Sequence, residues 1–277
     1  MTIWTPIGSG SDTSPPDDTV LPSPPGCWIV FIHGGAWRDP AVTASCFDRA
    51  AVALLSRARD SRSSPIAGLA SLNYRLSPHP NHPSDNPDNK ARHPDHIADV
   101  LTGLAFLQWL GGAKGEYLLA GHSCGATLAF QAVMHPARWG LSTVVNKPTA
   151  VVGLNGLYDL AGFIARPPSA FEGLRDAYED FTRGAFGDEE EVWRAVCPTT
   201  AEGWTREWTA SRRRAVLVQS SEDTLVPREQ LEGLKASLEE EGVEVREMGA
   251  GGEHDEMWDK GEGRMAQILW DVVSELE

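Results

Sequence analysis

Gly121-His122-Ser123-Cys124-Gly125 has the spacing of a Gly-x-Ser-x-Gly motif and stands between the apolar run Tyr117–Ala120 and the helix-like stretch Thr127–Val133. A nucleophilic serine at a strand-to-helix elbow occupies such a position. The two glycines carry no side chains that would collide in the tight turn, so the serine hydroxyl projects from the end of a sheet. Because chains rich in Gly and Ser produce this pentapeptide by chance, Ser123 needs a second feature to support it as a nucleophile.

The second feature is a glycine pair that follows an apolar run. Trp28–Ile32 has the pattern of a buried strand and leads into His33-Gly34-Gly35-Ala36-Trp37. In hydrolases with a serine elbow, a loop at this place offers backbone N–H groups to the oxyanion of a tetrahedral intermediate. An ordinary glycine turn after a strand is the alternative. The serine motif downstream favours the oxyanion loop.

An acid and then a histidine should follow such a serine in the chain. Asp223 stands just past the strand pattern Ala215–Gln219, in a turn closed by Pro227. A carboxylate there can accept the Nδ1–H of an imidazole. Glu222 is the competing acid, but the shorter Asp223 side chain matches the usual acid position better. His254 follows at the end of a glycine-rich loop, a position that suits an imidazole moving protons between the serine and a leaving group.

Other histidines compete for this role, and all of them precede Asp223 in the chain: His33, His93, His96, His122 and His135. That position does not fit the order serine, acid, histidine. His33 has the alternative task of ordering the glycine loop through a hydrogen bond. The chain order therefore favours His254.

Length and composition limit the class of protein. The chain has 277 residues, 41% of them hydrophobic, and a formal net charge of −15. This length suits a single α/β domain over residues 26–277, after a proline-rich N-terminal lead-in at residues 1–25. The negative charge argues against nucleic-acid partners, because their phosphates would be repelled.

Neither a membrane span nor a metal site is indicated. No apolar stretch approaches the ~18 residues of a spanning helix, and Met1–Gly10 lacks the regions of a secretory signal. The four cysteines show no Cys-x-x-Cys spacing, so neither a zinc site nor a disulfide framework is expected. We therefore expect a cytoplasmic protein that acts on a small molecule, without cofactor, metal or membrane partner. Self-association as a homodimer is left open.

Strand and helix patterns alternate along the domain. Helical patterns cover Val42–Arg59, Pro94–Leu110, Arg228–Glu241 and Met265–Leu276, and further strand patterns cover Ile66–Asn73, Ala150–Leu154 and Glu244–Glu247. This alternation predicts an α/β fold with a mostly parallel central sheet and helices on both faces. Residues 160–214 break it and are interpreted as a helical cap insertion over the carboxyl ends of the strands. We expect Trp193, Trp204 and Trp208 to pack this insertion onto the body.

Four blocks resemble the kynurenine formamidases (arylformamidases) of fungi, which have the α/β-hydrolase fold. They are His33-Gly34-Gly35-Ala36-Trp37, Asn73-Tyr74-Arg75-Leu76-Ser77-Pro78, Gly121 through Thr127, and Gly156-Leu157-Tyr158-Asp159-Leu160. The first three also occur loosely in esterases similar to hormone-sensitive lipase. Those esterases usually carry a third glycine where Ala36 stands and Asp-Ser-Ala at the elbow. Trp37 and the Gly156 block look more like the formamidases.

The resemblance implies hydrolysis of N-formyl-L-kynurenine to L-kynurenine and formate, a step of tryptophan catabolism toward NAD. Ser123, His254 and Asp223 would be nucleophile, general base and orienting acid. The N–H groups that would hold the oxyanion belong to Gly34, Gly35, Ala36 and Cys124. No metal or cofactor has a role in this chemistry.

The substrate-binding residues are less defined by the sequence. Trp37, Tyr158 and Trp258 are candidates for an aromatic wall because they stand beside the catalytic loops, and core packing is the alternative for each. Arg38 or Arg75 could pair with the substrate carboxylate. Two other functions remain open: a general carboxylesterase with the same catalytic residues, and a non-catalytic binding protein with the hydrolase fold.

Overall fold

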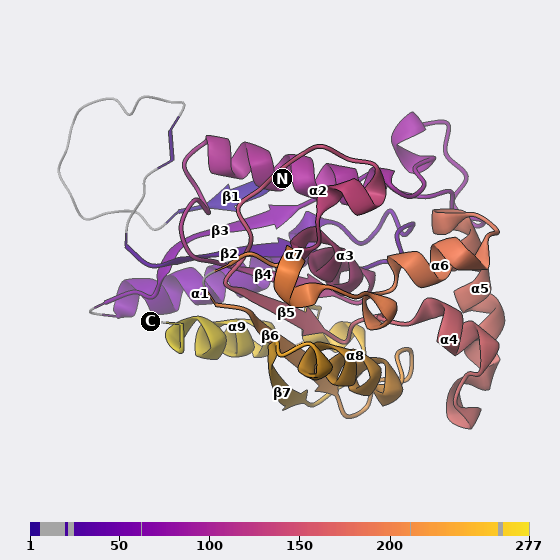
Figure 1. The fold of residues 1–277 in the computed structure, drawn as a ribbon. Coiled ribbons are helices and arrows are strands. Elements are labelled where there is room, and N and C mark those ends of the chain that lie inside the picture. The colour runs from indigo at the N-terminus through magenta and orange to yellow at the C-terminus, as the bar shows by residue number, and fades with distance from the viewer. Residues whose placement is uncertain (6–19, 22–24, 62, 211, 260–262, 277) are drawn as a thin grey trace.

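One seven-stranded sheet organises the protein in a computed structural model, which describes residues 1–5, 20–21, 25–61, 63–210, 212–259 and 263–276 (Figure 1). Its strands are β1 (Thr2–Trp4), β2 (Cys27–Ile32), β3 (Ile66–Leu72), β4 (Tyr117–His122), β5 (Ala150–Leu154), β6 (Arg214–Ser220) and β7 (Glu244–Ala250). They lie in the order β1-β3-β2-β4-β5-β6-β7. β1 is antiparallel to β3, and the other neighbouring pairs are parallel. The carboxyl ends of β2 through β7 therefore meet at one end of the sheet.

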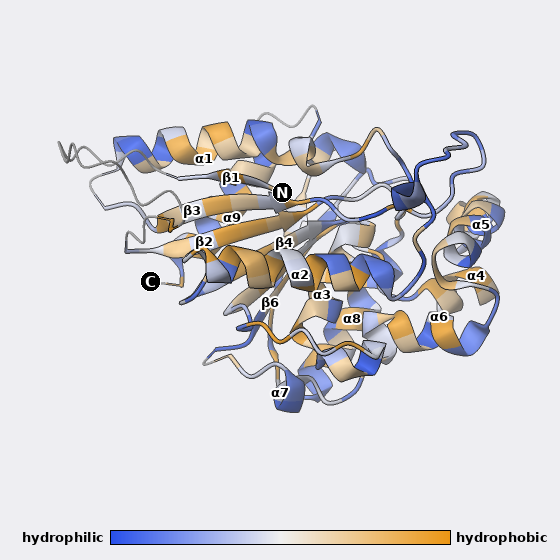
Figure 2. Cartoon of the chain, turned by 90° about the horizontal axis from the view of Figure 1, so that it is seen from above, coloured by the Kyte–Doolittle hydropathy of each residue, from blue (hydrophilic) through white to orange (hydrophobic). Residues whose placement is uncertain are grey.

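Helices cover both faces of this sheet. They are α1 (Asp48–Asp60), α2 (Asp95–Trp109), α3 (Cys124–Val133), α8 (Arg228–Glu240) and α9 (Arg264–Ser274). Along β2, Ile29 and Phe31 pack with residues of α1 and α9, whereas Val30 and Ile32 pack with residues of α2, α3 and α8. Successive side chains of a strand point to opposite faces, which explains this division. Figure 2 shows the hydrophobic residues concentrated on the strands and the helices banded with hydrophilic residues.

The chain between β5 and β6 carries α4 (Leu160–Ala165), α5 (Arg175–Phe186), α6 (Glu190–Val196) and α7 (Trp204–Glu207). Helices α4, α5 and α6 lie together beyond one end of the sheet (Figure 1). Trp193, Trp204 and Trp208 are all buried in the larger hydrophobic cluster. The Trp208 indole donates to the Pro148 carbonyl at 2.6 Å. These tryptophans thus pack the helical segment onto the body, as the sequence analysis predicted.

The predicted mostly parallel sheet with helices on both faces is confirmed, although some element bounds differ. The helix expected from Val42 begins at Asp48, because a 3-10 turn at Ala44–Phe47 precedes it. Strand β7 continues to Ala250, where it still pairs with Ser220. Strand β1 was not predicted, since three residues are too few to show a period. Most of the lead-in expected at residues 1–25 lies outside the described residues.

Candidate active site

Ser123 sits at the junction of β4 and α3 with an unusual backbone conformation, φ 54° and ψ −123°. A non-glycine residue in such a conformation costs on the order of 1–3 kcal/mol and persists only where its surroundings hold it. The Ser123 N–H donates to the Leu154 carbonyl at 2.9 Å, and the Ser123 carbonyl accepts from Ala126 at 3.0 Å and from Leu157 at 3.3 Å. These bonds fix the elbow between two strands and a helix. The residue lines a pocket of about 300 Å³.

The two glycines of the motif are required by close backbone contact. A Cβ on Gly121 would overlap the carbonyl of Gly125, and a Cβ on Gly125 would overlap the carbonyls of Ile32 and His33. The first turn of α3 therefore packs directly against the end of β2. This contact brings the serine next to the loop that follows β2.

The imidazole and the carboxylate expected to serve Ser123 lie in contact with each other. His254 Nδ1 is 2.8 Å from Asp223 Oδ2, and the Asp223 side chain is 1% exposed. The other carboxylate oxygen, Oδ1, accepts the N–H groups of Leu225 at 2.9 Å and Val226 at 2.8 Å. Gln219 donates its amide to Oδ2 at 3.1 Å. The carboxylate is thus fixed by four donors and can hold the imidazole in one tautomer.

The competing acid lies elsewhere, since Glu222 is exposed. The His254 loop is tied to the sheet through its own carbonyl. This carbonyl accepts from Asn155 Nδ2 at 3.0 Å, and His122 Nε2 lies 3.0 Å from it as a second donor. Sequence reasoning missed Gln219 and Asn155, because a single amide side chain at a strand end gives no pattern to detect.

The loop after β2 presents its backbone to the serine. A Cβ on Gly34 would come within 3.1 Å of the Ser123 Cβ, and Gly35 and Ala36 line the same pocket as Ser123. Gly35 has φ 90°, which glycine adopts without strain. In the described part of the chain, the N–H groups of Gly34 and Gly35 have no hydrogen-bond acceptor. The Cys124 N–H, in the first turn of α3, also points out of the helix.

The Cys124 thiol contacts this loop and the Tyr74 side chain. Its sulfur accepts the Trp37 N–H at 3.3 Å and lies 3.4 Å from the Tyr74 hydroxyl. That hydroxyl donates to the carbonyls of His33 at 3.1 Å and Gly34 at 2.9 Å. Burial raises the pKa of Cys124 to about 11, so the thiol is neutral at physiological pH. A neutral thiol is a poor nucleophile.

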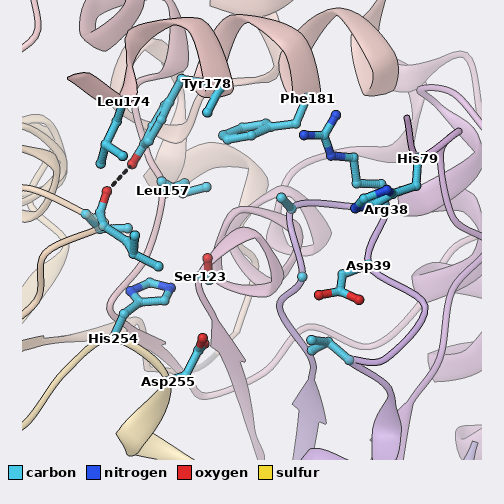
Figure 3. A pocket seen from close by; sticks show the side chains of 16 residues that line it. Arg38, Asp39, His79, Ser123, Leu157, Leu174, Tyr178, Phe181, His254 and Asp255 are labelled. Atoms are coloured by element: carbon cyan, nitrogen blue, oxygen red, sulfur yellow. Dashed lines mark hydrogen bonds between the residues drawn. The ribbon is translucent and has the colours of Figure 1, made fainter. Parts of the chain in front are cut away.

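A cavity of about 300 Å³ opens in front of Ser123 and His254. Leu157, Tyr178 and Phe181 line it, and Figure 3 shows Tyr178 and Phe181 on the upper side with Leu157 below them. Tyr178 and Phe181 belong to α5, so the segment between β5 and β6 forms part of the wall. Its charged lining residues are Arg38, Asp39 and Asp255, with His79 beside Arg38.

The three aromatic residues suggested as a wall lie in other places. Trp37 is fully buried, with its ring against Phe181 and Phe186. Tyr158 is buried too, because its ring packs over the Gly153 and Gly156 backbone.

Trp258 packs against the cluster of α1 and α9 and donates to Asp255 at 3.3 Å. The aromatic wall comes instead from Tyr178 and Phe181. Of the two suggested arginines, Arg38 lines the pocket, whereas Arg75 is bound to Asp99 by several hydrogen bonds.

One group of side chains in the described residues could hold a cation. The ligand atoms of His122, His254 and Asp255 lie within 4.8 Å of one another. One ring nitrogen of each histidine is already used in a hydrogen bond, and Asp255 is exposed. The group therefore carries no metal assignment.

The fold and the site place the protein in a known family. A model of the α/β hydrolase family matches residues 29–266, and the chain belongs to this family. The kynurenine formamidase-like hydrolase fscH of Fusarium equiseti is 38% identical over 248 residues, which cover 86% of this chain and 80% of that protein. The kynurenine formamidase avaC of Aspergillus versicolor is 35% identical over 256 residues, 87% of each chain. Within the α/β hydrolases, the chain thus belongs with the fungal kynurenine formamidases and their relatives.

Solved structures agree with the fold. An arylesterase has a TM-score of 0.64 at 17% identity and covers 92% of this chain and 77% of its own. A hormone-sensitive lipase from a metagenome library has the same TM-score at 19% identity, with 93% and 79% covered. Among the helices described, none is long and apolar enough to cross a membrane.

The buried histidines of this region predict a dependence of stability on pH. Burial lowers the pKa of His33 and His96 from 6.5 to about 4, and it lowers the pKa of His122 well below 6.5. These rings stay neutral in the fold and take up protons on unfolding below pH 6.5. The free energy of unfolding should therefore fall as pH drops from 6.5 to 4, by up to ~1.4 kcal/mol per pH unit for each histidine.

Urea unfolding at pH 7, 6 and 5 would measure this loss. In His96→Gln the slope of the free energy of unfolding against pH should be shallower, by the equivalent of about one proton taken up on unfolding. His82→Gln, at an exposed position, is the matched control. An unchanged slope in His96→Gln would contradict the assignment of a neutral buried ring.

Proposed function

We propose that this chain is a serine hydrolase that converts N-formyl-L-kynurenine to L-kynurenine and formate, a step of tryptophan catabolism toward NAD. The observation that carries the proposal is the similarity over most of the chain to proteins named kynurenine formamidase. The Asp223–His254 contact beside Ser123 supports a mechanism that needs only the protein's own groups.

The reaction begins with attack by Ser123. Its hydroxyl oxygen adds to the formyl carbon while His254 Nε2 takes the hydroxyl proton. Asp223 accepts the Nδ1–H and stabilises the imidazolium that forms. The developing oxyanion is held by the N–H groups of Gly35 and Cys124, with Gly34 and Ala36 as neighbouring donors. These amides carry partial positive charge at the loop and at the start of α3.

Collapse of the first intermediate releases the arylamine. The imidazolium of His254 protonates the leaving nitrogen, and the formyl group remains on the Ser123 oxygen. A water molecule then gives a proton to the same imidazole and attacks the formyl carbon. As the second intermediate collapses, the imidazolium returns this proton to the Ser123 oxygen, and the formic acid that is released ionises to formate.

The described pocket has a wall that can hold an aryl leaving group. The wall of Leu157, Tyr178 and Phe181 can hold a flat ring. We propose that residues 160–214 act as a cap that supplies this wall and keeps water away from the ring. Two contacts hold the Tyr178 side chain in place. Its hydroxyl donates to the Leu225 carbonyl at 2.9 Å, and its ring stacks on that of Phe163 with the ring centroids 3.8 Å apart.

Substitutions of the three catalytic residues test the mechanism. Ser123→Ala and His254→Ala should each lower kcat/KM on N-formyl-L-kynurenine by at least ~10³, because these groups act as a unit. Asp223→Asn should also be strongly impaired, since an amide at this place can favour the wrong imidazole tautomer.

Cys124→Ala is the matched control, because it removes the thiol and keeps the backbone N–H. It should keep kcat/KM within about tenfold of the original protein, by the reasoning that a neutral thiol takes no part in proton transfer or attack. A folded Ser123→Ala variant with near-normal turnover would show that another residue is the nucleophile. A folded Cys124→Ala variant without turnover would also contradict the assignment of Ser123 as the nucleophile.

A series of acyl groups on one arylamine tests the substrate class. Each methylene that the site cannot house should cost on the order of 1–3 kcal/mol. The kcat/KM values should therefore fall from formyl to acetyl to butyryl. Faster hydrolysis of butyryl compounds would replace the formamidase proposal by a general carboxylesterase, and no turnover of any member would favour a non-catalytic binding protein.

A further inference from the structure

Besides Ser123 and His254, the pocket is lined by two oppositely charged residues that are neighbours in the chain. Arg38 and Asp39 both line it. Arg38 pairs with Asp180 of α5, 2.6 Å from its Nη1, and lies over the Phe181 ring. Among the described residues it makes no ion pair with Asp39. Figure 3 shows Arg38 beside Phe181 and Asp39 apart from it, with Ser123 and His254 toward the other side of the view.

Both charged groups keep hydrogen-bonding capacity toward the pocket. The Arg38 side chain is only 14% exposed, and within the described chain its Nε and Nη2 have no acceptor. Asp39 uses Oδ1 to accept the Ala41 N–H at 2.9 Å, and Oδ2 has no donor in the same part of the structure. A partly buried guanidinium with two spare donors suits a carboxylate, which it can bind in a bidentate way.

His79 adds a neutral donor at this place. Its Nδ1 accepts the Asn81 N–H at 3.1 Å, so the proton of the neutral ring is on Nε2. Burial, followed by the nearby Arg38 charge, lowers the pKa of His79. The carboxylates of Asp39 and Asp180 act in the opposite direction and raise this pKa. The remaining carboxylate of the pocket, Asp255, lies beside His254, so it repels an anionic group from the reacting side.

We propose that this part of the pocket recognises a zwitterionic α-amino acid group on the substrate, with Arg38 binding its carboxylate and Asp39 its ammonium. The inference rests on the proposed function and names the residues that give it specificity. The ring would lie against Tyr178 and Phe181, and the formyl group would reach Ser123. An arylformamide without the amino acid group would leave the spare donors of Arg38 and the Oδ2 atom of Asp39 without partners, which lowers its affinity.

Three substrates and two substitutions test this recognition. The substrates are N-formyl-L-kynurenine, its analogue without the carboxylate, and its analogue without the amino group. The original protein should prefer the first over each analogue by about tenfold to a hundredfold in kcat/KM, the range of a charged hydrogen bond. Arg38→Met should reduce the preference for the carboxylate to near one, mainly through KM. Asp39→Asn, which keeps an acceptor for Ala41, should reduce the preference for the ammonium in the same way.

Asp180→Asn is the matched control, because it breaks the ion pair but leaves the guanidinium in place. It should keep the preference for the carboxylate. Since a preference is a ratio within one protein, it needs only residual activity. Arg38→Gln, which also removes the positive charge, provides a second variant if the Met variant does not fold, and it should lose the preference for the carboxylate in the same way.

The outcomes separate the two proposals. If the original protein hydrolyses N-formyl-L-kynurenine but shows no preference over the analogues, recognition by Arg38 and Asp39 is wrong and the formamidase proposal stands. The same holds if the Arg38 and Asp39 variants retain full preference. If the original protein hydrolyses none of the three, the proposed function falls and this inference falls with it.

Discussion

The conformation of Ser123 is the constraint on which the rest of the site depends. Its positive φ is unfavourable for a residue with a side chain, and it persists because Gly121 and Gly125 let α3 pack against the end of β2. Strand β4 lies between β2 and β5, so the loops after those strands are the first to reach the serine. The loop after β2 brings backbone N–H groups, and Leu157 after β5 bonds to the Ser123 carbonyl. Strands β6 and β7, farther along the sheet, bring the acid and the imidazole.

The electrostatics of the site follow from burial. One imidazole, that of His254, has a carboxylate partner, whereas His33 and His122 are buried without one and stay neutral. A neutral His122 can donate to the His254 carbonyl without adding a second positive charge next to the imidazolium. The buried Cys124 thiol, whose pKa burial raises to about 11, is likewise neutral and accepts the Trp37 N–H of the loop after β2. The rings and the thiol packed behind Ser123 are thus neutral, whereas the carboxylates of Asp223 and Asp255 carry the charge beside His254.

The parts of the site that the sequence could predict are those with local signatures. The elbow around Ser123, the glycine loop, and the positions of Asp223 and His254 after predicted strands each follow from a short stretch of chain, and the structure brings them together. The wall of the pocket could not be predicted from the sequence. Tyr178 and Phe181 come from the helical segment between β5 and β6, and no short-range sequence pattern indicates how that segment packs. Trp37, a large aromatic residue beside a catalytic loop, is buried in the hydrophobic core and does not line the pocket. The bounds of β7 and α1 also differ from the predicted ones. Pairing with β6 extends β7, and a 3-10 turn delays the start of α1.

Covalent labelling tests most directly whether the Ser123 elbow is the reactive centre. The protein is treated with a fluorophosphonate, the modified residue is identified by peptide mass spectrometry, and hydrolysis of N-formyl-L-kynurenine is followed in the same samples. We expect one phosphonyl group per chain, on Ser123, with activity lost in proportion to labelling. Labelling at another residue with loss of activity, or full activity in a protein labelled completely at Ser123, would contradict the serine mechanism.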